Sequence, residues 1–176
     1  TIGNIINCHI EANNLVQAQE LLNNLNDLKN QKSFKSLDIK VKIFTIYNNA
    51  QLVIYEKQGD FQKGLKRINE MEIGISNFQY KLNKEQTIQF YYRISYLYFG
   101  AGLYKDALKW VNKILNDNEQ ILRQDIYSFA KLFNLILHYE LNNYDLLDYI
   151  IKSTSRYLKK TEKNYQSEQV LIKYLK

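Results

Sequence analysis

The chain has 176 residues and is 45% hydrophobic, which predicts one globular domain. It contains six glycines and no proline. Because proline and glycine are the main helix breakers, we expect helix nearly throughout. Cys8 is the only cysteine, which excludes an intramolecular disulfide and a four-cysteine metal site. The net charge of +6 comes mostly from residues 152–176, which hold seven Lys or Arg against two Asp or Glu. Residues 1–151 hold 17 Lys or Arg against 16 Asp or Glu. The chain is therefore not basic throughout, as a generally basic nucleic-acid-binding protein would be.

The sequence shows no targeting or membrane segment. No apolar run approaches the roughly 18 residues that indicate a membrane span. The first residues lack the basic start and the unbroken apolar stretch of a signal peptide. We therefore expect a cytoplasmic protein without a membrane partner. Because the chain begins at Thr1 and not at methionine, we also expect it to be part of a longer protein.

Hydrophobic periodicity predicts an all-α fold of eight or nine helices. Four antiparallel helix pairs are expected at about residues 2–28, 38–79, 84–117 and 119–160, followed by a basic capping helix at residues 161–176. The individual helices are expected at about residues 2–12, 15–28, 38–58, 61–79, 84–101, 104–117, 119–141, 144–160 and 162–175.

Four similar turns are expected to join the helices of each pair. In each turn, an Asn or Gly that tolerates a left-handed backbone precedes a large apolar residue. The four are Asn13-Asn14-Leu15, Gly59-Asp60-Phe61, Gly102-Leu103-Tyr104 and Asn142-Asn143-Tyr144, and the small or apolar residues Ala18, Gly64, Ala107 and Leu147 follow three positions later. The apolar anchors lie 46, 43 and 40 residues apart, which indicates an irregular helical repeat.

Asn83 and Gln86 form a predicted capping box before the fifth helix.

The third pair has bulky, small and aromatic residues in a recognisable order around its turn, at Tyr91, Ile94, Ser95, Tyr98, Gly102, Tyr104, Ala107 and Val111. These positions match the signature of the tetratricopeptide repeat, which this pair resembles. Ile114 departs from the family's small residue, the closing proline is missing, and the other pairs match less well. The resemblance implies a right-handed α-solenoid over nearly the whole chain. The stretch from Tyr91 to about Tyr157 also resembles the C-terminal part of uncharacterised repeat proteins from Bacteroidetes-type bacteria, which implies no activity.

In tetratricopeptide proteins the first helix of each pair lines a concave groove that binds peptides. The resemblance therefore implies contacts at Asn49, Val53 and Glu56 of the second pair, Gln89, Tyr92, Tyr96 and Phe99 of the third, and Leu132, Ile136 and Tyr139 of the fourth. Tyrosine and phenylalanine provide a large contact area at a low entropic cost. Arg93, beside Tyr92, is a further candidate because it would bind an acidic group. The alternative is that the aromatic and aliphatic side chains pack under the next helix.

The basic C-terminal segment supports a second interpretation. Arg156, Lys159, Lys160 and Lys163, interleaved with Tyr157 and Tyr165, would contact the phosphates of a nucleic acid while the tyrosines stack on bases. The alternative is a polar cap, which the end of a helical repeat array requires. A cap would dock through an apolar face that consists of Leu158, Val170, Leu171 and Tyr174.

No group of residues indicates catalysis. Cys8 and His9 are adjacent, so their side chains diverge by about 100° on a helix and share a metal poorly. The glycines do not form a phosphate-binding loop. We therefore expect a non-catalytic scaffold that binds a protein or peptide, with no cofactor and no metal, and the sequence does not indicate its oligomeric state.

Overall fold

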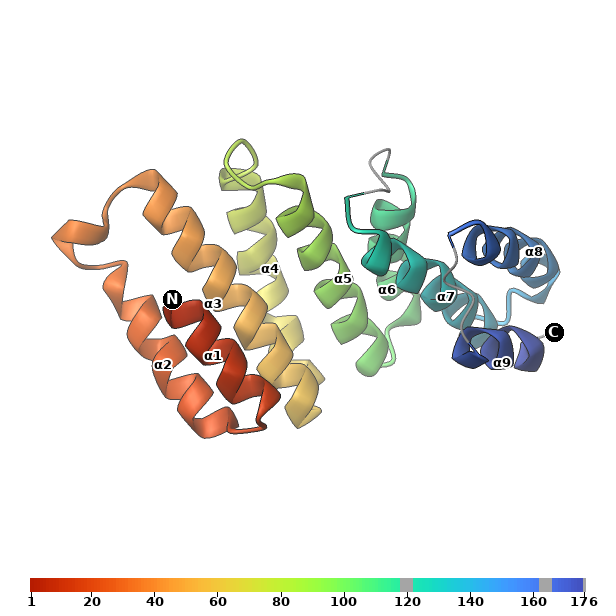
Figure 1. Cartoon of the computed structure of the whole chain (residues 1–176), viewed down its shortest axis with the longest axis horizontal. Coiled ribbons are helices and arrows are strands. Elements are labelled where there is room, and N and C mark those ends of the chain that lie inside the picture. The colour runs from red at the N-terminus through yellow and green to blue at the C-terminus, as the bar shows by residue number, and fades with distance from the viewer. Residues whose placement is uncertain (118–121, 162–165, 176) are drawn as a thin grey trace. The chain divides into compact units, whose positions relative to one another are not determined.

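The computed structural model describes residues 1–117, 122–161 and 166–175, and nine α-helices make up most of these residues. They are α1 (Ile2–Glu11), α2 (Leu15–Leu28), α3 (Leu37–Gln58), α4 (Phe61–Asn77), α5 (Lys84–Gly100), α6 (Tyr104–Leu115), α7 (Gln124–Glu140), α8 (Tyr144–Lys160) and α9 (Gln166–Tyr174), with a short 3-10 turn, η1 (Lys32–Phe34), after α2 (Figure 1). The helices pack mostly against their neighbours in the chain. The all-α prediction is therefore confirmed.

The predicted helix ends agree with the structure to within two residues, except at the starts of α7 and α9. These two starts lie next to residues 118–121 and 162–165, which are outside the described residues. The helix expected from about residue 119 begins at Gln124, because Arg123 has an extended φ of −131° and acts as the N-cap. The last helix, expected from about residue 162, is described from Gln166. The predicted capping box is confirmed: the Gln86 N–H donates to Asn83 Oδ1 at 2.9 Å, and the Asn83 N–H donates to Gln86 Oε1 at 3.0 Å.

The four predicted turns share one backbone geometry. Asn13, Gly59, Gly102 and Asn142 are left-handed, with φ values of 59°, 68°, 75° and 57°. In each turn, the residue after the left-handed one donates its N–H to the carbonyl oxygen five residues earlier, at 2.8–3.0 Å. This is the Schellman motif, which ends a helix and reverses the chain abruptly. The residues expected after the turns, Ala18, Gly64, Ala107 and Leu147, are all buried.

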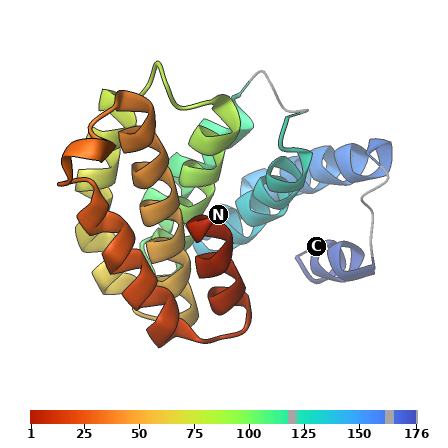
Figure 2. The ribbon, with the colours of Figure 1, turned by 60° about the vertical axis from the view of Figure 1, so that its left-hand side comes forward.

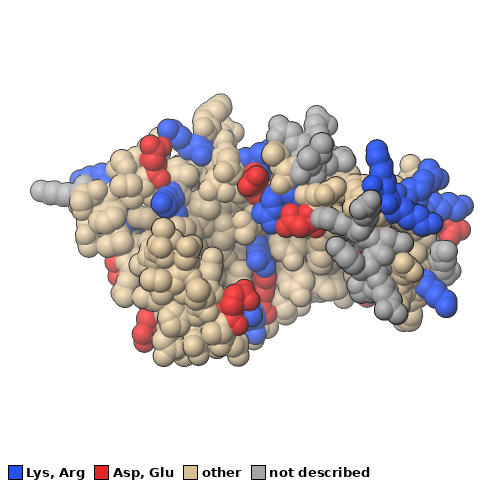
Figure 3. Space-filling model, in the orientation of Figure 1, with Lys and Arg blue, Asp and Glu red and all other residues tan. Residues whose placement is uncertain are grey.

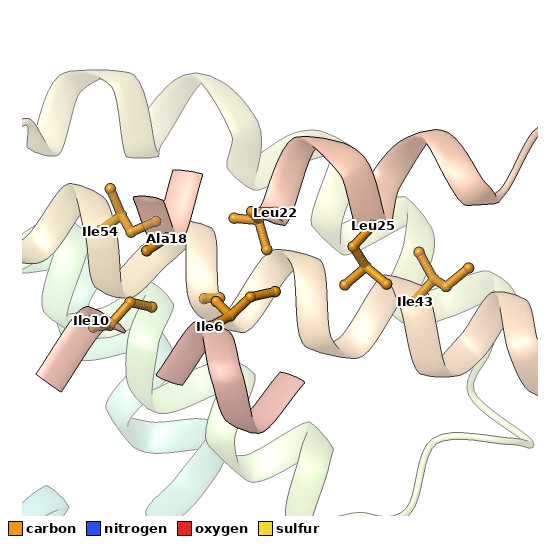
Figure 4. Close-up of a cluster of buried hydrophobic side chains, with 8 residues drawn as sticks. Ile6, Ile10, Ala18, Leu22, Leu25, Ile43 and Ile54 are labelled. Carbon is orange, nitrogen blue, oxygen red and sulfur yellow. The ribbon is translucent and has the colours of Figure 1, made fainter. Parts of the chain in front are cut away.

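The described chain divides into two compact units. The first, Thr1–Arg93, contains α1 to α4 and the first part of α5. Helices α1 and α2 both pack against α3 (Figures 1 and 2). Their shared core consists of Ile6, Ile10, Ala18, Leu22, Leu25, Ile43, Ala50 and Ile54, most of which are labelled in Figure 4. Helix α1 approaches α3 closely at Gly3, where a Cβ atom would lie 3.2 Å from Cδ1 of Ile46.

The second unit, Ile94–Lys176, contains the rest of α5 and helices α6 to α9. One of its cores joins α7, α8 and α9 through Leu135, Leu147, Ile151, Leu158, Ile172 and Leu175. The docking face expected for the last helix is partly wrong: Leu171 packs on this core, but Val170 and Tyr174 are 63% and 75% exposed. Ile172 and Leu175 are buried in their place, because they share one face of the helical turn with Leu171. Along the described stretches, no helix has the length and apolar character needed to cross a membrane.

Candidate functional site

A pocket of about 470 Å³ in the first unit is the candidate site. Its walls come from α1, α3 and the start of α5, which are the first helices of three successive pairs. Four of the predicted contact residues, Asn49, Val53, Gln89 and Arg93, line this pocket. They come from two helices that are separated in the chain by α4, so the packing of α3 and α5 brings them together.

The first pair supplies the wall that sequence reasoning missed. Gly3, Asn7 and Ile10 of α1 all line the pocket. They lie twelve, eight and five residues before the anchor Leu15, just as Asn49, Val53 and Glu56 lie before Phe61, and Tyr92, Tyr96 and Phe99 before Tyr104. Counting back from the turn would therefore have found them, although none resembles an aromatic or charged contact residue.

Side-chain amides are the characteristic polar groups of this pocket. Asn4, Asn7, Asn49 and Gln89 all line it, and each offers both a hydrogen-bond donor and an acceptor. Asn49 Oδ1 is buried and has no hydrogen-bond partner among the described residues. Because buried polar atoms are nearly always paired, a rotation of the Asn49 side chain toward the pocket would let this oxygen gain a partner by accepting a hydrogen bond from a ligand. Apolar side chains, including Ile10, Ile46 and Val53, separate the amides.

Arg93 is held by an ion pair that forms inside the first unit. Its Nη1 donates to Glu56 Oε2 at 2.8 Å, and the two side chains are only 24% and 10% exposed. The contact is a single hydrogen bond, because Glu56 Oε1 and Arg93 Nε are buried without partners in the part of the chain that the structure describes. Burial therefore outweighs the attraction of Arg93 and raises the pKa of Glu56 from 4.5 to about 7. Near neutral pH, the carboxyl group that pairs with Arg93 therefore gains or loses a proton readily.

The three predicted aromatic contacts are half-buried and take part in packing. The Tyr92 ring lies 5.3 Å from the guanidinium of Arg93. Tyr96 and Phe99 belong to the second unit, where their ring centroids lie 6.3 and 5.0 Å from that of Phe133 on α7. The alternative of packing under the next helix therefore describes part of the environment of Tyr96 and Phe99.

The predicted phosphate contacts gather on α8 and not on the terminal helix. Arg156, Lys159 and Lys160 are all exposed in the last two turns of α8, and Lys163 lies outside the described residues. Figure 3 shows Lys and Arg side chains clustered over α8. The expected basic character of the terminal helix is thus carried by the preceding helix, because α8 continues to Lys160. Within the described ranges, no three His, Cys, Asp or Glu side chains come together in a way that could hold a metal ion.

Comparisons with known proteins add no family. No protein-family model matches the chain, and neither curated proteins nor solved structures provide a match. The tetratricopeptide resemblance therefore remains a prediction from sequence. What the structure itself establishes is an all-α protein whose helices pack mostly in sequence order.

Proposed function

We propose that this chain is a non-catalytic scaffold that binds an extended segment of a partner protein in the pocket formed by α1, α3 and α5. We further propose that its helix pairs form a right-handed solenoid of the tetratricopeptide type. Four identical Schellman turns and the packing of consecutive helices support the solenoid. The buried small or apolar residue three positions after each turn anchor supports it as well.

The observation that carries the functional proposal is the equivalence of the pocket residues. Gly3 and Asn49 lie twelve residues before their turn anchors, Asn7 and Val53 lie eight residues before the same anchors, and all four line one pocket. A surface built from equivalent positions of stacked repeats is continuous along the array, and it therefore suits an extended ligand better than a compact one.

The chemistry of the pocket favours a polypeptide. A peptide backbone presents alternating N–H and C=O groups, and a side-chain amide pairs with both. Asn49 Oδ1 would gain the partner it lacks, which removes the cost of a buried unpaired oxygen. The apolar side chains between the amides would accommodate the alternate side chains of an extended segment.

A peptide selection tests this proposal. The full chain is used to select binders from a random peptide library, and the affinity of the selected peptides is measured by fluorescence polarisation. Asn49→Ala is expected to weaken binding by about tenfold, since a lost hydrogen bond to a buried group contributes about 1–2 kcal/mol. The matched control, Asn69→Ala, removes an exposed amide of α4 outside the pocket and should leave binding unchanged. Equal binding by both variants would contradict the site, and failure to select any peptide would contradict the function.

The cluster on α8 supports nucleic-acid binding as a second candidate function. Lys152, Arg156, Lys159 and Lys160 are exposed and spaced so that they lie along one side of the helix. Asp148 borders the same shallow hollow as Lys152 and Arg156, which reduces the positive potential there. A fluorescent single-stranded oligonucleotide should bind at low salt and dissociate steeply as salt rises, and Arg156→Glu with Lys160→Glu should abolish binding. Unchanged binding by this double variant would exclude the cluster.

A further inference from the structure

A second pocket, of about 450 Å³, lies between α2, α3 and α4 in the first unit. It is lined on α3 by Lys40, Phe44 and Tyr47, whereas Thr45 and Asn49 of the same helix line the pocket of the proposed peptide site. With about 100° between successive residues, these two rows lie on opposite sides of α3. A ligand in the second pocket would therefore not compete for space with a ligand in the first.

The charged groups around this second pocket are mostly positive. Lys29, Lys40 and Arg67 line it, against the single carboxylate of Glu70. The Glu70 side chain is 73% exposed, and its Oε2 lies 3.6 Å from Arg67 Nη2, which is too far for a good hydrogen bond. Glu70 therefore satisfies little of the Arg67 guanidinium. Lys29 Nζ donates to the neutral Asn26 Oδ1 at 3.0 Å. The positive charges of all three groups are therefore largely uncompensated and would attract an anion into the pocket.

Arg67 is oriented by its surroundings. Its guanidinium carbon lies 5.2 Å from the centroid of the Tyr47 ring, a cation–π arrangement that holds the group at the pocket wall. The Arg67 Nε is buried, whereas the side chain as a whole keeps 29% of its surface exposed. The Nη groups of a guanidinium can bind a carboxylate through two parallel hydrogen bonds.

The rest of the lining is apolar and rigid. Phe44 packs against Phe78 with ring centroids 5.2 Å apart, and against Phe90 at 5.6 Å. The Phe44 ring also lies very close to Gly74 of α4. A Cβ atom added to Gly74 would overlap Cε2 of Phe44 and lie 2.5 Å from its Cζ. The ring thus forms a fixed wall, and Ile73, which is 54% exposed, adds an apolar edge.

We propose that this pocket binds an organic carboxylate that carries an apolar group. Arg67 binds the carboxylate, Lys40 adds to the attraction, and the apolar group lies against Phe44 and Phe78. A pocket of this volume accommodates a small ligand of this kind. The carboxylate belongs either to a free acid or to the C-terminal residue of a peptide, because both present the same chemistry to Arg67.

Two pairs of probes test the proposal on the full chain by isothermal titration calorimetry and saturation-transfer NMR. Phenylacetate is compared with phenylacetamide, and the peptide Ala-Ala-Ala-Phe is compared with its C-terminal amide. Each acid should bind at least about tenfold more tightly than its amide, since the charged hydrogen bonds are lost in the amide. If phenylacetate binds as tightly as the peptide, the site accepts free acids, and if only the peptide binds, it accepts C-termini. Either result supports a carboxylate site, whereas amides that bind as tightly as acids, or no saturable binding of any probe, overturn it.

Single-residue variants test whether the acids bind in this second pocket. Arg67→Gln should weaken binding of the acids by about tenfold, while Lys66→Gln removes the same charge from an exposed neighbour on α4 and should have no effect. Lys40→Gln keeps the interior of the pocket intact and should weaken binding by a smaller factor, so that the proposal is tested even if Arg67→Gln unfolds. Equal loss of affinity in Lys66→Gln and Arg67→Gln would show a general charge effect and overturn the site. Asn49→Ala is expected to leave this binding unchanged, which separates it from the proposed peptide function.

Discussion

The buried pair of Glu56 and Arg93 makes a quantitative prediction about pH. Burial raises the pKa of Glu56 from 4.5 to about 7, so the folded state prefers the protonated carboxyl more than the unfolded chain does. The resulting stabilisation is fully present below about pH 4.5 and is lost as the pH rises through about 7. The difference between the two pKa values corresponds to about 3 kcal/mol, of which about 2.5 kcal/mol is lost between about pH 5 and about pH 8.5.

The assay compares the wild type with Glu56→Gln, which resembles the protonated carboxyl and cannot ionise. Urea unfolding followed by circular dichroism gives the free energy of unfolding of both proteins at the two pH values. The wild type should lose about 2.5 kcal/mol more than Glu56→Gln on going to the higher pH, because other titrating groups contribute equally to both. Glu72→Gln controls for the loss of one negative charge at an exposed position of α4.

An opposite sign, or a difference below about 1 kcal/mol, would show that the attraction of Arg93 outweighs burial and would refute this reasoning. A direct measurement is also available. The carboxyl carbon of Glu56 should titrate in NMR spectra with a midpoint of about 7, and Arg93→Met should raise that midpoint, because Arg93 lowers the pKa of Glu56.

Three further predictions concern helix packing and helix ends, and urea unfolding checks each. Gly74→Ala should destabilise the protein by about 1 kcal/mol or more, since the overlap with Phe44 outweighs the gain in helix propensity, and adding Phe44→Leu should recover part of the loss. Gly102→Ala should cost about 1 kcal/mol because φ is 75° there. Asn83→Ala should cost about 1 kcal/mol through the lost bond to the Gln86 N–H. Losses within about 0.3 kcal/mol of zero would contradict these three assignments.

Part of the candidate site could be predicted from the positions of residues along each helix. Asn49 and Gln89 were identified by transferring the groove positions of the tetratricopeptide family, and Arg93 by its place beside Tyr92. Their spacing from the turns is preserved because each helix runs without a break from the pocket to its turn. The wall formed by α1 could have been found by counting back from the first turn. The buried state of Glu56 and the missing partner of Asn49 Oδ1 could not have been found, because they depend on which side chains cover these atoms from other helices.

The sequence by itself determined the helices and their ends. With no proline, and with Gly or Asn at the four left-handed positions, hydrogen bonds between residues at most five positions apart decide where each helix stops. Only the tertiary structure decided which faces of those helices meet. Glu56 pairs with Arg93 across 37 residues, and Phe44 reaches Gly74 of another helix. Such contacts follow from how α3, α4 and α5 pack together, and a helical spacing that marks a face as apolar does not specify which face of another helix covers it.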